Sequence, residues 1–136
     1  MNRPLPPAIK QYIAGAPVCR IATVRPSGEP HVIPVCPVFD GDATVYVDLD
    51  PRSATAAGLR AEPRVAVLID EYHDDWARLR KVILRCTAEA VAGPEQDAAW
   101  ERIRAKFPQH ALIDWQPRLT IALRIYDWLQ EGVAPD

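Results

Sequence analysis

The stretch "CRIATVRPSGEPHVIPV", residues 19–35, places two apolar runs around one turn and decides the fold class. The first run is rich in β-branched side chains that roughly alternate with others, which is typical of a strand. "PSG" at residues 26–28 combines residue types that favour tight turns. The second run is again β-branched, so the sequence predicts a β-hairpin here.

The second run extends through "PHVIPVCPVF", residues 30–39. Its odd-numbered residues, from His31 to Phe39, share one side, because strand side chains alternate. Pro34 and Pro37 lack a backbone N–H, which favours a strand that is paired on one side only or is bulged. We therefore expect this strand to border an opening.

Four further strands follow from apolar periodicity, at residues 44–49, 64–70, 81–92 and 118–128. Short helices are expected after Pro6 and Pro7, at residues 52–62 and after Gly93. Six strands with short helices predict a mainly β fold, a six-stranded antiparallel barrel with helical plugs. The length suits one domain, residues 1–136, with 1–15 as a helical cover and 16–129 as the barrel.

The composition limits the kinds of binding partner that can be expected. The net charge is −2 and charges of both signs are interspersed, which argues against nucleic acid or an anionic membrane as a partner. The N-terminus has no apolar signal-peptide core, and no apolar run approaches the ~18 residues of a membrane span. Cys19, Cys36 and Cys86 lack metal or disulfide spacing and are expected as reduced core residues. These features predict a cytoplasmic protein with small-molecule or protein partners.

The start of the helix at 52–62 has the properties of an anion site. First-turn N–H groups are unpaired within a helix and the helix dipole is positive there. Arg52 adds a charged donor, and Ser53 and Thr55 add hydroxyl donors. The alternative is that Asp50 or Ser53 only caps the helix.

Other polar and aromatic residues are candidates for a ligand site or for a structural role. His31 is either a structural histidine or a ligand-contacting one beside the opening. Trp76, among charged residues, is either a packing lid or a stacking surface for a planar ligand. His73 with Asp74 and Asp75 has no second histidine at ligand spacing, so no metal site is predicted. Three further tryptophans are assigned to packing: Trp100, Trp115 and, as a barrel plug, Trp128.

A family resemblance rests on the opening stretch together with "VYVDLD" (45–50), "LRAEPRVAVLID" (59–70) and "DEYHDDWARLRKVILRCTAEAV" (70–91). In this order they resemble the flavin-binding split-barrel family related to pyridoxamine 5'-phosphate oxidase. The last segment resembles the branch described as enzymes that use the deazaflavin coenzyme F-420. The resemblance covers about four-fifths of the chain, to "RIYDW" at 124–128.

The resemblance implies a homodimeric split barrel that holds FMN or F-420 in a groove between subunits. It also implies an oxidoreductase that transfers a hydride to or from a small planar substrate, with the reactive chemistry supplied by the ring. Two alternatives remain open. One is a non-catalytic dimer that binds FMN, F-420 or haem, and the other is a degenerate member that has lost its cofactor.

Carried over by position, the resemblance implies ring contacts and phosphate contacts. Relatives commonly read Ser-Arg-Lys at the helix start, whereas this chain reads "SAT" at 53–55, so Ala54 and Thr55 supply no charge. Arg52 and Arg60 are the cations that could compensate. His31 and Tyr72 are the candidate proton donors. The implied contacts are His31, Ile33, Pro34, Val35, Asp48 and Leu49 for the ring, Arg52, Ser53, Thr55 and Arg60 for the phosphate, and Trp76 for stacking.

Overall fold

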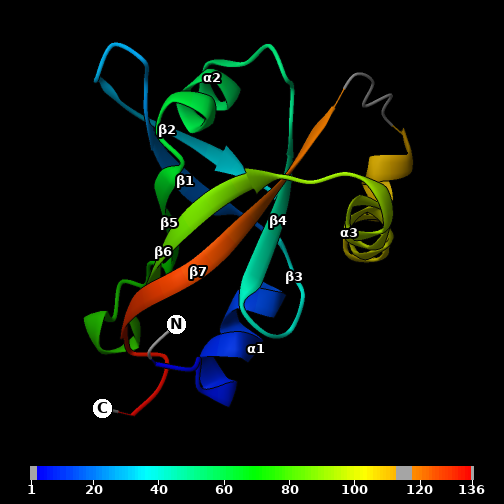
Figure 1. Cartoon of the computed structure of the whole chain (residues 1–136). Helices are drawn as coiled ribbons and strands as arrows, with labels where there is room; N and C mark the ends of the chain where they lie inside the picture. Colours follow the sequence, from blue (N-terminus) through cyan, green and yellow to red (C-terminus); the bar gives the residue numbers. More distant parts are fainter. Residues whose placement is uncertain (1–2, 113–117, 136) are drawn as a thin grey trace.

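Seven strands form one antiparallel sheet in the computed structural model, which describes residues 3–112 and 118–135 (Figure 1). The order across the sheet is β2-β1-β5-β6-β7-β4-β3. The bounds are β1 (Cys19–Val24), β2 (Pro30–Val35), β3 (Val38–Phe39), β4 (Thr44–Leu49), β5 (Arg64–Glu71), β6 (Arg80–Ala90) and β7 (Leu119–Glu131). The sheet curls into a half-barrel, which confirms the mainly β, split-barrel fold class.

The predicted hairpin is present, with Cys19 opposite Val35 and Val24 opposite Pro30. Its turn is closed by hydrogen bonds from the Gly28 N–H to the Arg25 carbonyl, 2.8 Å, and from the Arg25 N–H to the Glu29 carbonyl, 2.9 Å. Gly28 has φ of +91°, a conformation that favours glycine.

The single strand expected over residues 30–39 is wrong, because the structure divides it into β2 and β3. The division falls at Cys36 and Pro37, where a proline has no N–H to donate to a ladder. β2 and β3 are the two outermost strands of the sheet, yet only two residues join them. The two edges must therefore approach one another, which closes the sheet on itself and raises the count from six strands to seven.

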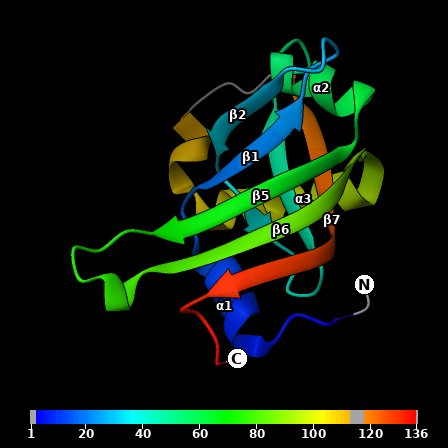
Figure 2. The ribbon, with the colours of Figure 1, turned by 90° about the vertical axis from the view of Figure 1, so that its left-hand side faces the viewer.

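The main core lies inside the curl. Alternate residues of β4 and β7 enter it, among them Val45, Val47 and Leu123. Helix α1 (Pro7–Gly15) adds Ile9 and Ile13 and lies at one end of the sheet (Figure 2). Apolar burial of this kind is the dominant stabilising contribution to the fold.

Helix α3 (Gly93–Lys106) packs on the opposite face of β4 and β7. Ile103 and, just after the helix, Phe107 contact Tyr46 and Ala122 in a second buried cluster. The short 3-10 helix η2 (Pro108–Leu112) follows. β4 therefore has a core face and a face toward α3, and its last residues lie beside both.

Helix α2 (Ala54–Ala61) lies at the end of the sheet opposite α1 (Figure 1). The Ser53 side chain accepts a hydrogen bond from the Ala56 N–H, 3.1 Å, and so caps the helix. A Cβ added at Gly58 would lie 2.9 Å from the Val24 carbonyl oxygen, so this glycine lets α2 approach the end of β1. The start of α2 lies next to the end of β4, because only residues 50–53 connect the two elements.

The β5–β6 connection contains the 3-10 helix η1 (Trp76–Arg78) and extends beyond the rest of the sheet (Figure 2). No helix among the described residues is long and apolar enough to cross a membrane.

Candidate functional site

A groove of 340 Å³ opens where β2, the end of β4, the start of α2 and the α3–η2 segment meet. This volume lies at the small end of the range for ligand pockets, about 300–1,000 Å³. Most of the wall is apolar, and the polar groups gather near the end of β4. The lining residues are Ile33, Pro34, Val35, Cys36, Asp48, Leu49, Asp50, Ser53, Ile103, Phe107, Gln109 and His110.

Half of this wall consists of residues singled out from the sequence. Six of those residues line the groove, and they come from β2, the end of β4 and the start of α2: Ile33, Pro34, Val35, Asp48, Leu49 and Ser53. Six others do not line it: His31, Arg52, Thr55, Arg60, Tyr72 and Trp76. The structure thus brings the implied ring contacts together, apart from His31, and separates most of the implied phosphate contacts from them.

Arg52 is engaged by a carboxylate. Its Nε and Nη2 donate to the two oxygens of Asp50, each at 3.1 Å, and its backbone N–H donates to the same group. Hydrogen bonds from Arg52 hold the pKa of Asp50 below its usual value, and the same pairing raises the pKa of Arg52. Arg60 donates to the Pro51 carbonyl, 3.0 Å, and Thr55 is buried. The start of α2 thus presents Asp50 to the groove with its nearest cation already paired.

Tyr72 and Trp76 form an exposed aromatic pair on the β5–β6 connection. The Trp76 Nε1–H donates to the Tyr72 hydroxyl, 3.3 Å, and Trp76 is 74% exposed. His31 is half-buried on the edge strand β2, opposite Thr23. Within one chain, none of these three residues lines the groove.

Asp48 is the centre of a polar network that the sequence did not indicate. Its side chain is 6% exposed, and its Oδ1 accepts a hydrogen bond from the Thr120 hydroxyl, 2.7 Å. Thr120 lies opposite Asp48 in the β4–β7 register. The Thr120 oxygen in turn accepts hydrogen bonds from Gln96 and Trp100, at 3.0 and 2.9 Å. α3 is therefore tied through Thr120 to the carboxylate at the groove.

Two basic side chains face the other oxygen of Asp48. Arg118 Nη1 lies 3.6 Å and His110 Nε2 3.8 Å from Oδ2. Oδ2 has no hydrogen-bond partner among the described residues. The Arg118 guanidinium also lies 3.4 Å from the centroid of the Trp100 ring. Burial, aided by Arg118, lowers the pKa of His110, while the Asp48 carboxylate opposes this shift.

Two cations of α3 hold the groove walls together. Lys106 Nζ donates to the Pro37 carbonyl, 2.8 Å, and Arg102 Nη1 donates to the Phe39 carbonyl, 3.2 Å. The Pro37 carbonyl lies in the break between β2 and β3, and the Phe39 carbonyl belongs to the last residue of β3. Burial lowers the pKa of Lys106. These bonds tie α3 to β3 and to the connection that follows β2, next to the groove.

The cysteines divide into two kinds. Cys19 and Cys86 are buried, and burial raises the pKa of each thiol to about 12. Cys36 was expected in the core, but this is wrong: it is exposed and lines the groove, because the chain leaves the sheet there. The described residues contain no group of three His, Cys, Asp or Glu side chains that could hold a metal ion.

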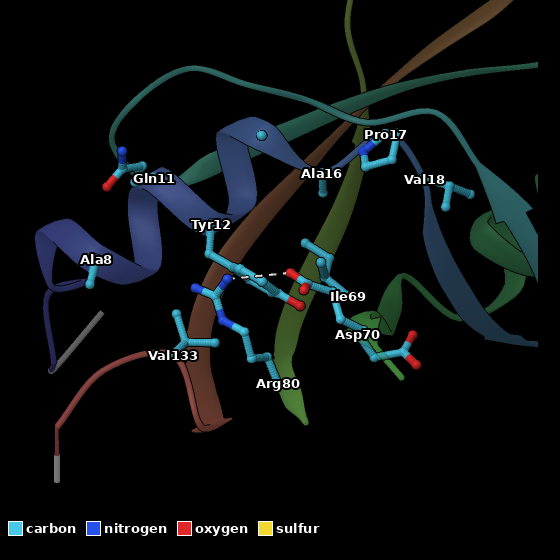
Figure 3. A pocket seen from close by; sticks show the side chains of 12 residues that line it. Ala8, Gln11, Tyr12, Ala16, Pro17, Val18, Ile69, Asp70, Arg80 and Val133 are labelled. Atoms are coloured by element: carbon cyan, nitrogen blue, oxygen red, sulfur yellow. Dashed lines mark hydrogen bonds and ion pairs between the residues drawn. The ribbon is translucent and has the colours of Figure 1, made fainter. Parts of the chain in front are cut away.

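A second cavity, of 640 Å³, lies between α1 and the ends of β5 and β6 (Figure 3). The Arg80 guanidinium stacks on the Tyr12 ring, 4.6 Å from the centroid, and pairs with Glu71 at 3.4 Å. Burial, followed by the charge of Glu71, raises the pKa of Tyr12 to about 12. No implied cofactor contact lies in this cavity, and its one aromatic face is already covered by Arg80, so the smaller groove is the candidate site.

Sequence reasoning missed the residues from the α3–η2 segment and from the start of β7. Trp100 was assigned to packing, whereas it also donates a hydrogen bond within the Asp48 network. A signal was present in "RLT", residues 118–120, where a charged and a hydroxyl residue begin an otherwise apolar strand. The packing assignment for Trp115 lies outside the described residues.

A family model described as pyridoxamine 5'-phosphate oxidase matches residues 5–130. The chain belongs to this family. The match includes every described α-helix, every groove residue and the whole sheet except Glu131, the last residue of β7. No curated protein sequence matches this chain.

The solved structures of similar fold include proteins that are described with different ligands. The haem storage protein HutZ from Vibrio cholerae has a TM-score of 0.80 at 17% identity, covering 96% of this chain and 97% of that one. An FAD-binding protein from Mesorhizobium loti has a TM-score of 0.70 at 22% identity, and the match covers 93% of this chain and 94% of that one. A protein described as an F420 reductase has a TM-score of 0.73 at 18% identity, and the match covers 92% of this chain and 98% of that one.

These likenesses, all at low identity, establish the fold of the pyridoxamine 5'-phosphate oxidase family. The chain spans about half the length of two other matches, a protein of unknown function from Agrobacterium tumefaciens and a haem-binding protein from Mycobacterium smegmatis, of which it covers 54% and 55%.

The groove fits the two ends of a flavin-type cofactor unequally. Its apolar walls and one buried carboxylate oxygen that makes no hydrogen bond to a described residue suit a planar heterocycle with a polar edge. The phosphate end does not match the implied pattern, since Arg52 is paired with Asp50 and Ser53 caps the helix.

Proposed function

We propose that this protein binds a planar redox cofactor, of the flavin or deazaflavin type represented by FMN and F-420, in the groove at the end of β4. The observation that supports this most strongly is the convergence of Ile33, Pro34, Val35, Asp48 and Leu49 on one groove of ring size. These are ring contacts that the family resemblance implies. The F420 reductase and the FAD-binding protein of similar fold point the same way.

We propose that the protein is an oxidoreductase acting on a small planar substrate. When bound, the ring would supply hydride transfer. The chain's own contribution would be to bind and orient the ring, with Pro34 and Leu49 beside it and Asp48 toward its polar edge. Hydride transfer by the ring does not require a general acid from the groove. If the reaction uses a proton donor, His31 and Tyr72 remain the predicted candidates.

We also propose a homodimer, which the family resemblance implies. Large apolar side chains are exposed on the surface of the single chain, among them Val32, Tyr126 and Leu129. The projecting β5–β6 connection is the element that could carry Tyr72 and Trp76 toward the groove of a second subunit. A cytoplasmic location is supported by three free thiols, one of them exposed.

Haem binding without catalysis is the second candidate. His110 lines the groove, and an imidazole is a common axial ligand of haem iron. The haem storage protein of similar fold supports keeping this alternative.

Equilibrium titration with riboflavin, FMN, F-420 and haem tests these proposals. We expect saturable binding of a flavin or deazaflavin, with a change in its fluorescence or absorption. Cys36→Trp fills the groove from an exposed position and should weaken binding by about tenfold or more. Ala14→Trp, exposed on α1 at the other end of the sheet and outside the groove, is the control and should leave binding unchanged.

Two results would decide against the proposal. If haem alone binds, the storage alternative holds, and if no ring binds, the degenerate alternative holds. Reduction of the bound cofactor, followed by transfer to a panel of planar acceptors, separates an enzyme from a carrier. A sedimentation mass of one chain in the presence of ligand would contradict the homodimer.

A further inference from the structure

We propose that the groove selects a planar heterocycle that donates a ring N–H to Asp48 and that carries no phosphate monoester at the α2 end. The inference rests on the proposed function and specifies its ligand class. Two independent features of the groove carry it, one at Asp48 and one at Asp50.

The first feature is the Oδ2 oxygen of Asp48, which is buried, lies near the cationic side chain of Arg118 and makes no hydrogen bond to a described residue. Oδ1 is satisfied by the Thr120 hydroxyl at 2.7 Å, but Oδ2 has no hydrogen-bond partner among the described residues. The nearest cationic nitrogen, of Arg118, is 3.6 Å away, beyond hydrogen-bond distance. The side chain is 6% exposed and lines the groove, and Oδ2 itself is buried, so a ligand donor reaches it only if the side chains that cover it move aside. A buried acceptor without a donor is costly, so a donor supplied by the ligand gains more here than at an exposed site.

A carboxylate oxygen accepts hydrogen bonds and repels carbonyl oxygens. It therefore distinguishes a ring edge that presents N–H from one that presents only C=O. The pyrimidine edge of an isoalloxazine ring carries one imide N–H, at N3, between two carbonyls. The apolar walls at Pro34 and Phe107 suit the rest of such a ring.

The second feature is the charge at the start of α2. Asp50 lines the groove there, and no Lys or Arg is among the described residues that line it. A phosphate dianion at this end would face the Asp50 carboxylate. The one adjacent cation, Arg52, makes two hydrogen bonds to Asp50, and the Ser53 oxygen already accepts from Ala56. Phosphate would have to displace these bonds, so it adds no affinity.

Side-by-side titration with riboflavin and FMN, which differ only in the phosphate, tests the second feature. We expect riboflavin to bind at least as tightly as FMN. Asp50→Asn keeps the acceptor for the Arg52 N–H and releases the guanidinium, so FMN should gain about tenfold or more while riboflavin is unchanged. Glu62→Gln is the matched control, because Glu62 makes the same kind of exposed pair with Arg64 outside the groove. It should change neither ligand.

A riboflavin methylated at N3 tests the first feature on the wild-type protein. Replacing N–H by N–CH₃ removes the donor to Asp48, and binding should weaken by about tenfold or more. Asp48→Asn places an amide where the carboxylate was and should reduce the difference between the two rings. Thermal unfolding of this variant shows whether it is folded. If it is not, the comparison of the two rings on the wild type still decides.

The outcomes separate the inference from the function on which it rests. Flavin binding in the groove with FMN tenfold tighter than riboflavin, or with N3-methylation tolerated, would overturn the inference and leave the proposed function standing. Absence of binding by every ring would overturn both. Riboflavin preference, together with loss on N3-methylation, supports the inference.

Discussion

The guanidinium of Arg118 lies 3.6 Å from the carboxylate of Asp48, and both side chains are less than a tenth exposed. Asp48 is the penultimate residue of β4, whereas Arg118 immediately precedes β7, the neighbouring strand. The pair joins the floor of the groove to the strand that also carries Thr120. Ligand binding and fold stability are therefore coupled at this point.

Arg118→Met should destabilise the protein by about 3–5 kcal/mol, because it leaves the buried charge of Asp48 without its cation. Urea unfolding followed by tryptophan fluorescence measures this. The double variant Asp48→Asn with Arg118→Met should regain part of the loss, since no unpaired charge remains. Arg64→Met, which breaks the exposed Glu62 pair, should change stability far less, because water screens that pair. Equal losses in Arg118→Met and Arg64→Met would rule out a buried pair.

His110 should make stability depend on pH on the acid side of neutrality. Burial, Arg118 and Arg104 lower its pKa below the ordinary 6.5, and Asp48 only partly opposes them. Between the folded pKa and 6.5 the unfolded chain binds more protons, so stability falls as pH decreases through that window and is fully present above it. His110→Asn should flatten Tm against pH between about pH 5 and pH 7, whereas its non-titrating neighbour Gln109→Asn should not. A wild-type slope in His110→Asn would exclude this residue as the source.

Lys106→Met should loosen the groove. The ammonium group donates to the Pro37 carbonyl across the two walls, and its loss should cost about 1–2 kcal/mol and weaken ligand binding. Arg104→Met on the same helix removes only an exposed pair with Glu101 and serves as the comparison. Unchanged binding in Lys106→Met would mean that this bond does not set the groove width.

Gly58→Ala should lower the melting temperature although alanine is the better helix former. The added Cβ would lie 2.9 Å from the Val24 carbonyl oxygen, so α2 must move away from β1, at about 1–3 kcal/mol. At Gly15, the last residue of α1, an added Cβ meets nothing within 4 Å. Gly15→Ala should therefore be neutral or stabilising, by up to about 1 kcal/mol. A stabilised Gly58→Ala protein would contradict the close approach of α2 to β1.

Most of the fold was predictable from the sequence because its signals are local. The turn at "PSG", the alternating strands and the prolines before α1 each act within a few residues. The division of the predicted strand at Pro37 was not foreseen, because the proline by itself indicates only an edge strand or a bulge, whereas the chain there passes from one edge of the sheet to the other.

The site was predictable only in part. The family resemblance implies ring contacts at positions along β2 and β4, and most of these positions line one groove. The partners of Asp48 depend on the register of β4 against β7, where Thr120 lies 72 residues away in sequence. The pairing of Arg52 with Asp50, in contrast, is a local contact that the pattern "DPR" permits but does not require.

The exposed thiol of Cys36 gives the most direct test that the ring lies in the groove. Cys19 and Cys86 are buried with thiol pKa values raised to about 12, so an alkylating reagent should modify the folded protein at Cys36 alone. The account predicts that the rate of Cys36 alkylation falls in proportion to occupancy as riboflavin is titrated. An unchanged rate at saturating riboflavin would contradict binding in this groove.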